Sequence, residues 1–214
     1  MSYKAVLFDM DGTLLDTLED LCDSTNHALA QMGYPLRGIE EIRRFIGNGA
    51  EKQIRRAVPE GTSEGKIMET LAAFRAYYQD HCQIKTKVYD GLLDVLSELK
   101  EKGVKMAVVS NKPDAAVKPL CAHYFPGIFA LGETAGCPRK PDKAMVLKAM
   151  DAIGVTECIY VGDSEVDVRT AKNAGVPCLS VLWGFRDREQ IGGTVYCETV
   201  NCLVPMLEEM ACGK

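Results

Sequence analysis

The sequence predicts an α/β protein, in which a parallel sheet covered by helices carries an inserted all-helical domain. Three observations support this. Short apolar runs of strand length alternate with helical patterns in the second half of the chain, which is typical of a parallel sheet with helices on both faces. Residues 17–84 contain helical patterns alone. The chain has 214 residues, enough for one large domain or for a domain with a sizeable insertion.

Four apolar runs have the length and composition of strands, at residues 4–8, 105–109, 158–161 and 178–182. Each is rich in Val, Ile, Tyr or Phe, and polar residues or glycine bound it. A weaker run at 127–131 is a fifth candidate. Helical patterns between the runs end at Gly103 and Gly175, as expected of glycine at a helix C-terminus. The predicted core is a Rossmann-like parallel sheet formed by residues 1–16 and 85–214.

The inserted segment, residues 17–84, has no convincing strand. A helical face runs from Leu18 to Met32 and ends at Gly33, with Thr17 and Asp20 as a candidate capping pair. Further helical patterns cover residues 40–46, 50–58 and 66–79. We therefore expect a helical-bundle domain of residues 17–84, inserted into the core.

Composition limits the partners of the chain. The net charge is −5, from 25 basic and 30 acidic residues, and there is no block of five or more basic residues. This argues against nucleic acid and against a membrane surface as partners. No apolar run approaches the length of a membrane span, and the N-terminus lacks a signal-peptide pattern, so we expect a cytoplasmic protein. The nine scattered cysteines fit reduced thiols better than disulfides or zinc.

Polar side chains follow three of the predicted strands at the point where each strand ends, in residues 9–13, 110–112 and 163–167. Because ligands bind at the carboxyl ends of parallel strands, these segments should converge. They contain four acids: Asp9, Asp11, Asp163 and Asp167. Four carboxylates at one point would repel one another without a cation among them, and ligands that are all oxygen favour Mg²⁺. Each acid alone is best explained as a solvated loop residue, but the set is best explained as a magnesium site.

The second of these segments supplies hydrogen-bond donors. Ser110 and the backbone amides of Asn111 and Lys112 suit a phosphoryl oxygen. Lys140 precedes Pro141, which favours an extended loop conformation. A lysine in such a loop is usually a solvated surface charge, but a site with four acids and a phosphate dianion needs a cation in addition to the metal.

Four segments of the chain resemble the four motifs of the haloacid dehalogenase (HAD) superfamily. They are FDMDGTLLDT at 8–17, VSNK at 109–112, KP at 140–141 and VGDSEVD at 161–167, in that family's order. The helical insertion matches the position of the family's α-helical cap. The resemblance covers essentially the whole chain and implies the HAD fold, a cap at residues 17–84 and a Mg²⁺ cofactor.

The resemblance also implies a phosphoaspartyl mechanism. Asp9 would be the nucleophile that attacks phosphorus, and Asp11 would protonate the leaving oxygen and then activate the hydrolytic water. Asp9, the backbone carbonyl of Asp11 and Asp163 would hold Mg²⁺. Asp167 would order the waters of the metal or Lys140. Lys140 would shield the nucleophile from the charge of the phosphate.

Four residues are implied as phosphate ligands: Ser110, Asn111, Gly12 and Thr13. The dehalogenases and the ATPases of the superfamily lack an acid at the position of Asp11. The resemblance therefore implies a phosphatase or a phosphomutase.

The segment RRFIGNGA at 43–50 resembles the cap segment of phosphoglycolate phosphatases, as does the SNK form of the second motif. The candidate specificity residues are Arg43, Gly47, Asn48 and Gly49. A Gly-Asn-Gly turn brings backbone amides and the Asn48 amide close to a small ligand, and Arg43 or Arg44 would pair with a carboxylate. The simpler alternative is an interhelical turn flanked by solvated arginines. We expect a phosphoric monoester hydrolase that acts on a small phosphorylated metabolite, and 2-phosphoglycolate is the best candidate. The protein is expected to be a monomer or a homodimer.

Other interpretations stay open. A β-phosphoglucomutase would use the same residues with a longer-lived phosphoaspartate and a cap pocket of sugar size. Pyrophosphatase and nucleotidase activities also occur on this scaffold. A non-catalytic binding protein on the same fold would be expected to lack Asp9, Asp11, Lys140 or Asp163, and all four are present.

Overall fold

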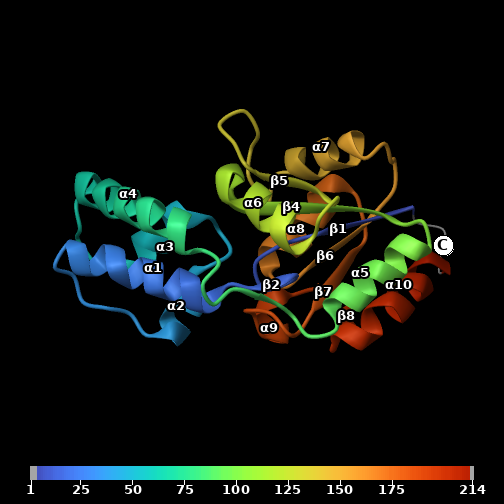
Figure 1. Cartoon of the computed structure of the whole chain (residues 1–214), viewed down its shortest axis with the longest axis horizontal. Helices are drawn as coiled ribbons and strands as arrows, with labels where there is room; N and C mark the ends of the chain where they lie inside the picture. The colour runs from blue at the N-terminus through green and yellow to red at the C-terminus, as the bar shows by residue number, and fades with distance from the viewer. Residues whose placement is uncertain (1–3, 213–214) are drawn as a thin grey trace. The chain divides into compact units, whose positions relative to one another are not determined.

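The computed structural model describes residues 4–212, which form two compact units (Figure 1). We call residues 4–15 and 88–212 the sheet unit, and residues 16–87 the helical unit. Two short strands, β2 (Leu15–Asp16) and β3 (Lys87–Val88), pair with each other where the chain passes from one unit to the other.

The sheet unit contains a six-stranded sheet in the order β5-β4-β1-β6-β7-β8, with parallel pairing throughout. Its strands are β1 (Ala5–Phe8), β4 (Lys105–Pro113), β5 (Phe129–Glu133), β6 (Ile159–Gly162), β7 (Cys178–Val181) and β8 (Tyr196–Cys197). The predicted parallel α/β core is confirmed, and all five predicted apolar runs are strands. The pattern does not predict β8, because two residues are too short for a periodic signal.

Helices cover both faces of this sheet, so every residue of β1 is buried. On one face, Ala5 and Leu7 belong to a cluster with Met145 and Val146 of α7 (Ala144–Ala152) and Ala171 of α8 (Glu165–Ala174). Helices α5 (Leu92–Glu101) and α10 (Leu203–Cys212) lie on the other side of the strands (Figure 1). The remaining helices of the unit are α6 (Asp114–Tyr124), α9 (Arg188–Ile191) and the 3₁₀ helix η1 (Val200–Cys202).

Strand β4 is longer than predicted. The apolar pattern ends at Val109, whereas the strand continues to Pro113 with a register shift against β5. Its extension carries Ser110, Asn111 and Lys112, which are 1%, 5% and 6% exposed. A hydropathy pattern does not predict this part of the strand, because its residues are polar although they are buried.

The helical unit contains α1 (Leu18–Gln31), α2 (Ile39–Phe45), α3 (Ala50–Ala57) and α4 (Glu64–His81). All four helices fall where the periodicity predicts them, with ends that differ by no more than two residues. The turn after α1 contains Gly33 with φ of 68°, as expected of a glycine that ends a helix.

The expected capping pair at the start of α1 is wrong, because the side chain of the N-cap residue Thr17 makes no capping hydrogen bond. The buried carboxylate of Asp20 instead accepts backbone N–H groups of Ile84, Lys85 and Thr86, at 3.1, 3.0 and 2.8 Å. These hydrogen bonds fasten the segment after α4 to α1. The predicted capping motif does not form, because residues 84–86 offer Asp20 three backbone donors where the motif would offer one.

We expect Asp20→Ala to destabilise the helical unit by about 2–4 kcal/mol, since three backbone donors, of which that of Thr86 is buried, lose a buried charged acceptor. Denaturant unfolding followed by circular dichroism measures this loss. The matched control is Asp80→Ala on the exposed surface of α4, which should change the unfolding free energy by less than about 0.5 kcal/mol. Equal stability of the two variants would contradict the role of Asp20.

Candidate active site

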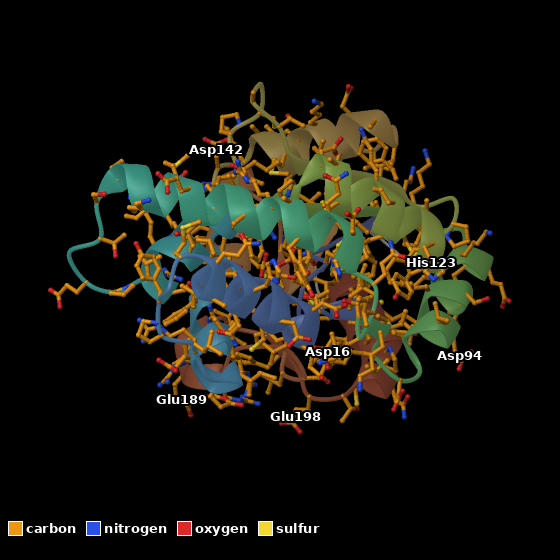
Figure 2. The ribbon with its side chains drawn as sticks, turned by 60° about the vertical axis from the view of Figure 1, so that its left-hand side comes forward. Asp16, Asp94, His123, Asp142, Glu189 and Glu198 are labelled. Atoms are coloured by element: carbon orange, nitrogen blue, oxygen red, sulfur yellow. The ribbon has the colours of Figure 1, made fainter. Side chains whose placement is uncertain are left out.

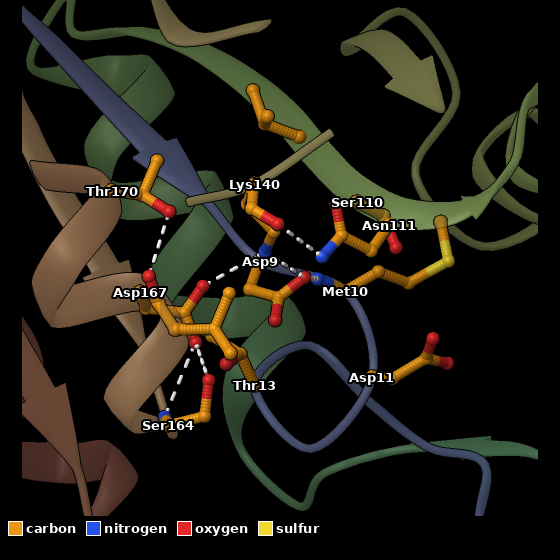
Figure 3. Close-up of polar contacts among 12 residues, drawn as sticks. Asp9, Met10, Asp11, Thr13, Ser110, Asn111, Lys140, Ser164, Asp167 and Thr170 are labelled. Atoms are coloured by element: carbon orange, nitrogen blue, oxygen red, sulfur yellow. Dashed lines mark hydrogen bonds and ion pairs between the residues drawn. The ribbon is translucent and has the colours of Figure 1, made fainter. Parts of the chain in front are cut away.

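The polar segments that follow β1 and β6 meet the polar extension of β4 at the carboxyl edge of the sheet (Figure 3). Asp9 follows β1 directly, and its backbone N–H donates to the carbonyl of Val161 in β6 at 2.9 Å. Asp163 follows β6, and Ser110 lies on the extension of β4. Since the three strands are parallel neighbours, their ends lie together.

Three of the four predicted acids form a cluster. One carboxylate oxygen each of Asp9, Asp163 and Asp167 lies within 4.8 Å of the others, and all three residues are buried. Asp11 is outside this group: its Oδ1 lies 3.1 Å from Lys112 Nζ, and its carboxylate points away from Asp9 in Figure 3. The expectation that four carboxylates converge is wrong for Asp11. The chain turns after Asp9, so the alternation that would place both side chains on one side is lost.

Lys140 lies at the centre of the cluster with a side chain only 1% exposed. Its Nζ is 2.8 Å from Asp9 Oδ1 and 2.8 Å from Asp167 Oδ1. It also donates to the hydroxyl of Tyr160 at 3.0 Å. The side chain of Asn111 donates to the backbone carbonyl of Lys140 at 3.0 Å. Asn111 therefore contacts the lysine loop, and its role as a phosphate ligand stays a prediction.

Both carboxylate oxygens of Asp167 make polar contacts. While its Oδ1 contacts Lys140, its Oδ2 accepts the backbone N–H and the hydroxyl of Ser164, at 3.2 and 2.5 Å. Ser164 is the N-cap of α8, so the same contacts begin the helix. With both oxygens engaged, Asp167 is better placed to hold Lys140 than to bind a metal.

Asp163 is held by two other segments. Its Oδ1 accepts the hydroxyl of Thr13 at 3.3 Å, and its Oδ2 accepts the backbone N–H of Phe185 at 2.7 Å. The amide of Gly12 donates to the backbone carbonyl of Leu15 at 2.8 Å. Gly12 and Thr13 thus form the turn after β1 and position Asp163. Binding of phosphate by these two residues stays a prediction.

Glycines pack directly against two of the acids. A Cβ added to Gly12 or Gly184 would overlap the carboxylate of Asp163, and one added to Gly162 would overlap Asp167. Gly12 also has φ of 83°, which favours glycine on conformational grounds. Gly184 lies in the loop after β7, and no sequence pattern relates it to Asp163.

The electrostatics of the cluster call for a cation. Burial and the charge of Asp167 raise the pKa of Asp163 to about 7, and the same two causes raise the pKa of Asp9 well above its usual value. Burial alone would lower the pKa of Lys140, but the charges of Asp167 and Asp9 outweigh it and hold this pKa well above the ordinary lysine value. One ammonium therefore faces three buried carboxylates. The donor set is all oxygen, which fits Mg²⁺.

Two buried side chains near the cluster escape prediction from the sequence. Lys112 pairs with Asp11, and the sequence suggests only its backbone amide as a donor. Tyr160 of β6 is fully buried, and burial raises the pKa of its phenol, so the hydroxyl keeps its proton. That hydroxyl lies 3.2 Å from Asp167 Oδ1. The apolar pattern predicts Tyr160 as a strand residue and leaves Lys112 outside the predicted strand, but it does not identify the partner of either side chain.

The predicted specificity residues lie in the helical unit. Gly47 and Gly49 have φ of 105° and 84°, a conformation that the plain-turn interpretation also requires. Asn48 between them is buried. Near the end of α2, Arg43 Nη1 lies 3.8 Å from Glu40 Oε2, and the side chain of Arg43 is partly exposed. Recognition of a substrate by these residues stays a prediction.

Taken together, the fold and the site define a parallel α/β enzyme with a buried carboxylate–lysine centre at the carboxyl edge of its sheet. A family model described as haloacid dehalogenase-like hydrolase matches residues 6–181. The chain belongs to this family.

Similar proteins include phosphoglycolate phosphatases. Phosphoglycolate phosphatase 1 of Pseudomonas aeruginosa is 36% identical, over 97% of this chain and 81% of its own length. The Pseudomonas putida phosphoglycolate phosphatase is 34% identical, over 98% and 82%. A crystal structure of a candidate phosphoglycolate phosphatase from Lactobacillus delbrueckii subsp. bulgaricus has 38% identity and a TM-score of 0.91, with 100% of both chains covered. Within residues 4–212, no helix has the length and apolarity needed to span a membrane.

Proposed function

We propose that this chain is a Mg²⁺-dependent phosphatase that hydrolyses 2-phosphoglycolate through an aspartyl-phosphate intermediate. The observation that carries this proposal is the buried pair of Asp9 and Lys140 beside Asp163 at the carboxyl edge of the sheet. A carboxylate that is fixed by an ammonium and placed at a cation site has what nucleophilic attack on a phosphate ester requires.

In the first step, a carboxylate oxygen of Asp9 attacks phosphorus, and the bond from phosphorus to the leaving oxygen breaks. Hydrogen bonds from the Met10 amide at 2.7 Å and from Lys140 hold the carboxylate in place. The charge of Lys140 reduces the repulsion between the carboxylate and the phosphate dianion. Asp11 donates a proton to the leaving oxygen, so the alcohol departs neutral.

In the second step, water attacks the phosphorus of the aspartyl phosphate while Asp11 accepts its proton, and the bond to Asp9 breaks to release phosphate. The hydroxyl of Ser110, on the extension of β4, binds a phosphoryl oxygen. Asn111 contributes by holding the Lys140 loop. Asp9, Asp163 and the backbone carbonyl of Asp11 would hold Mg²⁺, which when bound supplies positive charge against the phosphoryl oxygens.

The substrate is proposed from the relatives named phosphoglycolate phosphatase. Residues 17–84 are proposed as the cap domain, with Arg43 and the turn at 47–49 as its recognition segment. All nine cysteines are free thiols, which supports a reducing compartment such as the cytoplasm.

The test is phosphate release from a panel of esters, with Mg²⁺ and with a chelator. The panel contains 2-phosphoglycolate, sugar phosphates, nucleoside monophosphates and pyrophosphate. We expect chelator-sensitive turnover, with kcat/KM for 2-phosphoglycolate at least about tenfold above the others, as a charge-assisted contact to its carboxylate provides. Turnover spread over sugar phosphates or nucleotides would overturn the assignment of 2-phosphoglycolate as the substrate, but it would leave the proposed reaction in place. No release from any ester would overturn both.

A further inference from the structure

Lys112 is a buried cation beside the proposed acid–base residue, and the mechanism above gives it no role. Its side chain is 4% exposed, and its Nζ lies 3.1 Å from Asp11 Oδ1. It stands on the extension of β4, where its backbone N–H donates to the hydroxyl of Ser110 at 3.2 Å. Burial of an ammonium costs free energy even when an anion is near, so a lysine here calls for a functional explanation.

The position of Lys112 relative to the substrate follows from the chemistry of the leaving group. As the proton donor, Asp11 must come within hydrogen-bond distance of the leaving oxygen. In 2-phosphoglycolate the carboxylate carbon is two bonds beyond that oxygen. An ammonium in contact with Asp11 is therefore within reach of the substrate carboxylate.

We propose that Lys112 determines specificity by binding the carboxylate on the leaving group of the substrate. The inference rests on the proposed phosphatase function and names the residue that selects among its esters. It places carboxylate recognition on β4 of the sheet unit, whereas the sequence predicts it for Arg43 or Arg44 in the helical unit. A neutral leaving group provides no anion for Lys112, so esters of neutral alcohols are disfavoured.

The test compares two esters of similar length, 2-phosphoglycolate and 2-hydroxyethyl phosphate, whose leaving group carries no charge. We expect Lys112→Met to lower the ratio of their kcat/KM values by roughly 10- to 100-fold, the effect of one charge-assisted hydrogen bond. The ratio does not depend on the fraction of folded enzyme, because misfolding lowers both values equally. Lys112→Arg keeps a cation and should recover part of the ratio. Lys112→Gln serves as a second neutral variant if Lys112→Met fails to fold.

The matched control is Lys118→Met, which removes a surface lysine paired with Asp114 at 2.6 Å on α6 and should keep the wild-type ratio. A wild-type ratio in both neutral variants at Lys112 would overturn the inference. A ratio that collapses in Arg43→Met and not in Lys112→Met would place recognition in the helical unit and overturn it too. Wild-type enzyme that hydrolyses no ester would overturn the proposed function itself, and the inference with it.

Discussion

Asp9→Asn is expected to lower kcat for 2-phosphoglycolate by roughly 10⁴- to 10⁶-fold, the range seen when a covalent nucleophile is removed. The amide has the size of the carboxylate but lacks the nucleophilic oxygen, so no aspartyl phosphate forms. Lys140 keeps its contact with Asp167, which preserves the rest of the cluster. The measurement is the initial rate of phosphate release in saturating Mg²⁺.

The fold of this variant should persist, because it removes a charge that the site disfavours. Burial already raises the pKa of Asp9, so a neutral side chain at position 9 relieves repulsion from Asp167. Thermal melting should show a folded protein, and calorimetry should still detect binding of inorganic phosphate in Mg²⁺. The control is Asp142→Asn, at an exposed position labelled in Figure 2, which should keep the wild-type rate. Turnover by Asp9→Asn near the wild-type rate would remove Asp9 as the nucleophile.

The parts of the site that the sequence predicts are those fixed by strand ends. Asp9, Ser110 and Asp163 follow or end apolar runs, and parallel strands bring such positions to one edge. The fold class follows from the same alternation of apolar runs and helical patterns. Lys140 does not directly follow a predicted strand. Only the need for a cation and the family resemblance indicate its role.

The remainder of the site depends on contacts that a local pattern cannot show. The turn after β1 directs Asp11 toward Lys112, and hydropathy gives no sign that a lysine on β4 is buried. Asp20 fails as a capping residue for a similar reason, since its partners lie more than 60 residues away. Sequence periodicity predicts which elements form, but it does not identify the partner of a buried polar group.

Gly184→Ala is expected to lower kcat/KM by about 10²-fold, the usual effect of moving a catalytic group by roughly an ångström. The added methyl would overlap the side chain of Asp163 and the backbone carbonyl of Gly12. A carbonyl within a tight turn yields less readily than a flexible side chain, so Asp163 must move. Since Asp163 is a proposed Mg²⁺ ligand, the Mg²⁺ concentration for half-maximal rate should rise as well. The measurement is the rate of phosphate release against Mg²⁺ concentration.

Overpacking at Gly184 should also reduce the unfolding free energy by about 1–3 kcal/mol, which leaves most molecules folded at 25 °C. Melting curves separate this loss from the kinetic one. Gly136→Ala is the control, because Gly136 lies in the same unit, has no positive φ and has open space around its Cβ position. It should match the wild type in rate and in Mg²⁺ dependence. If Gly184→Ala also matches the wild type at every Mg²⁺ concentration, catalysis tolerates a displaced Asp163, and its assignment as a metal ligand fails.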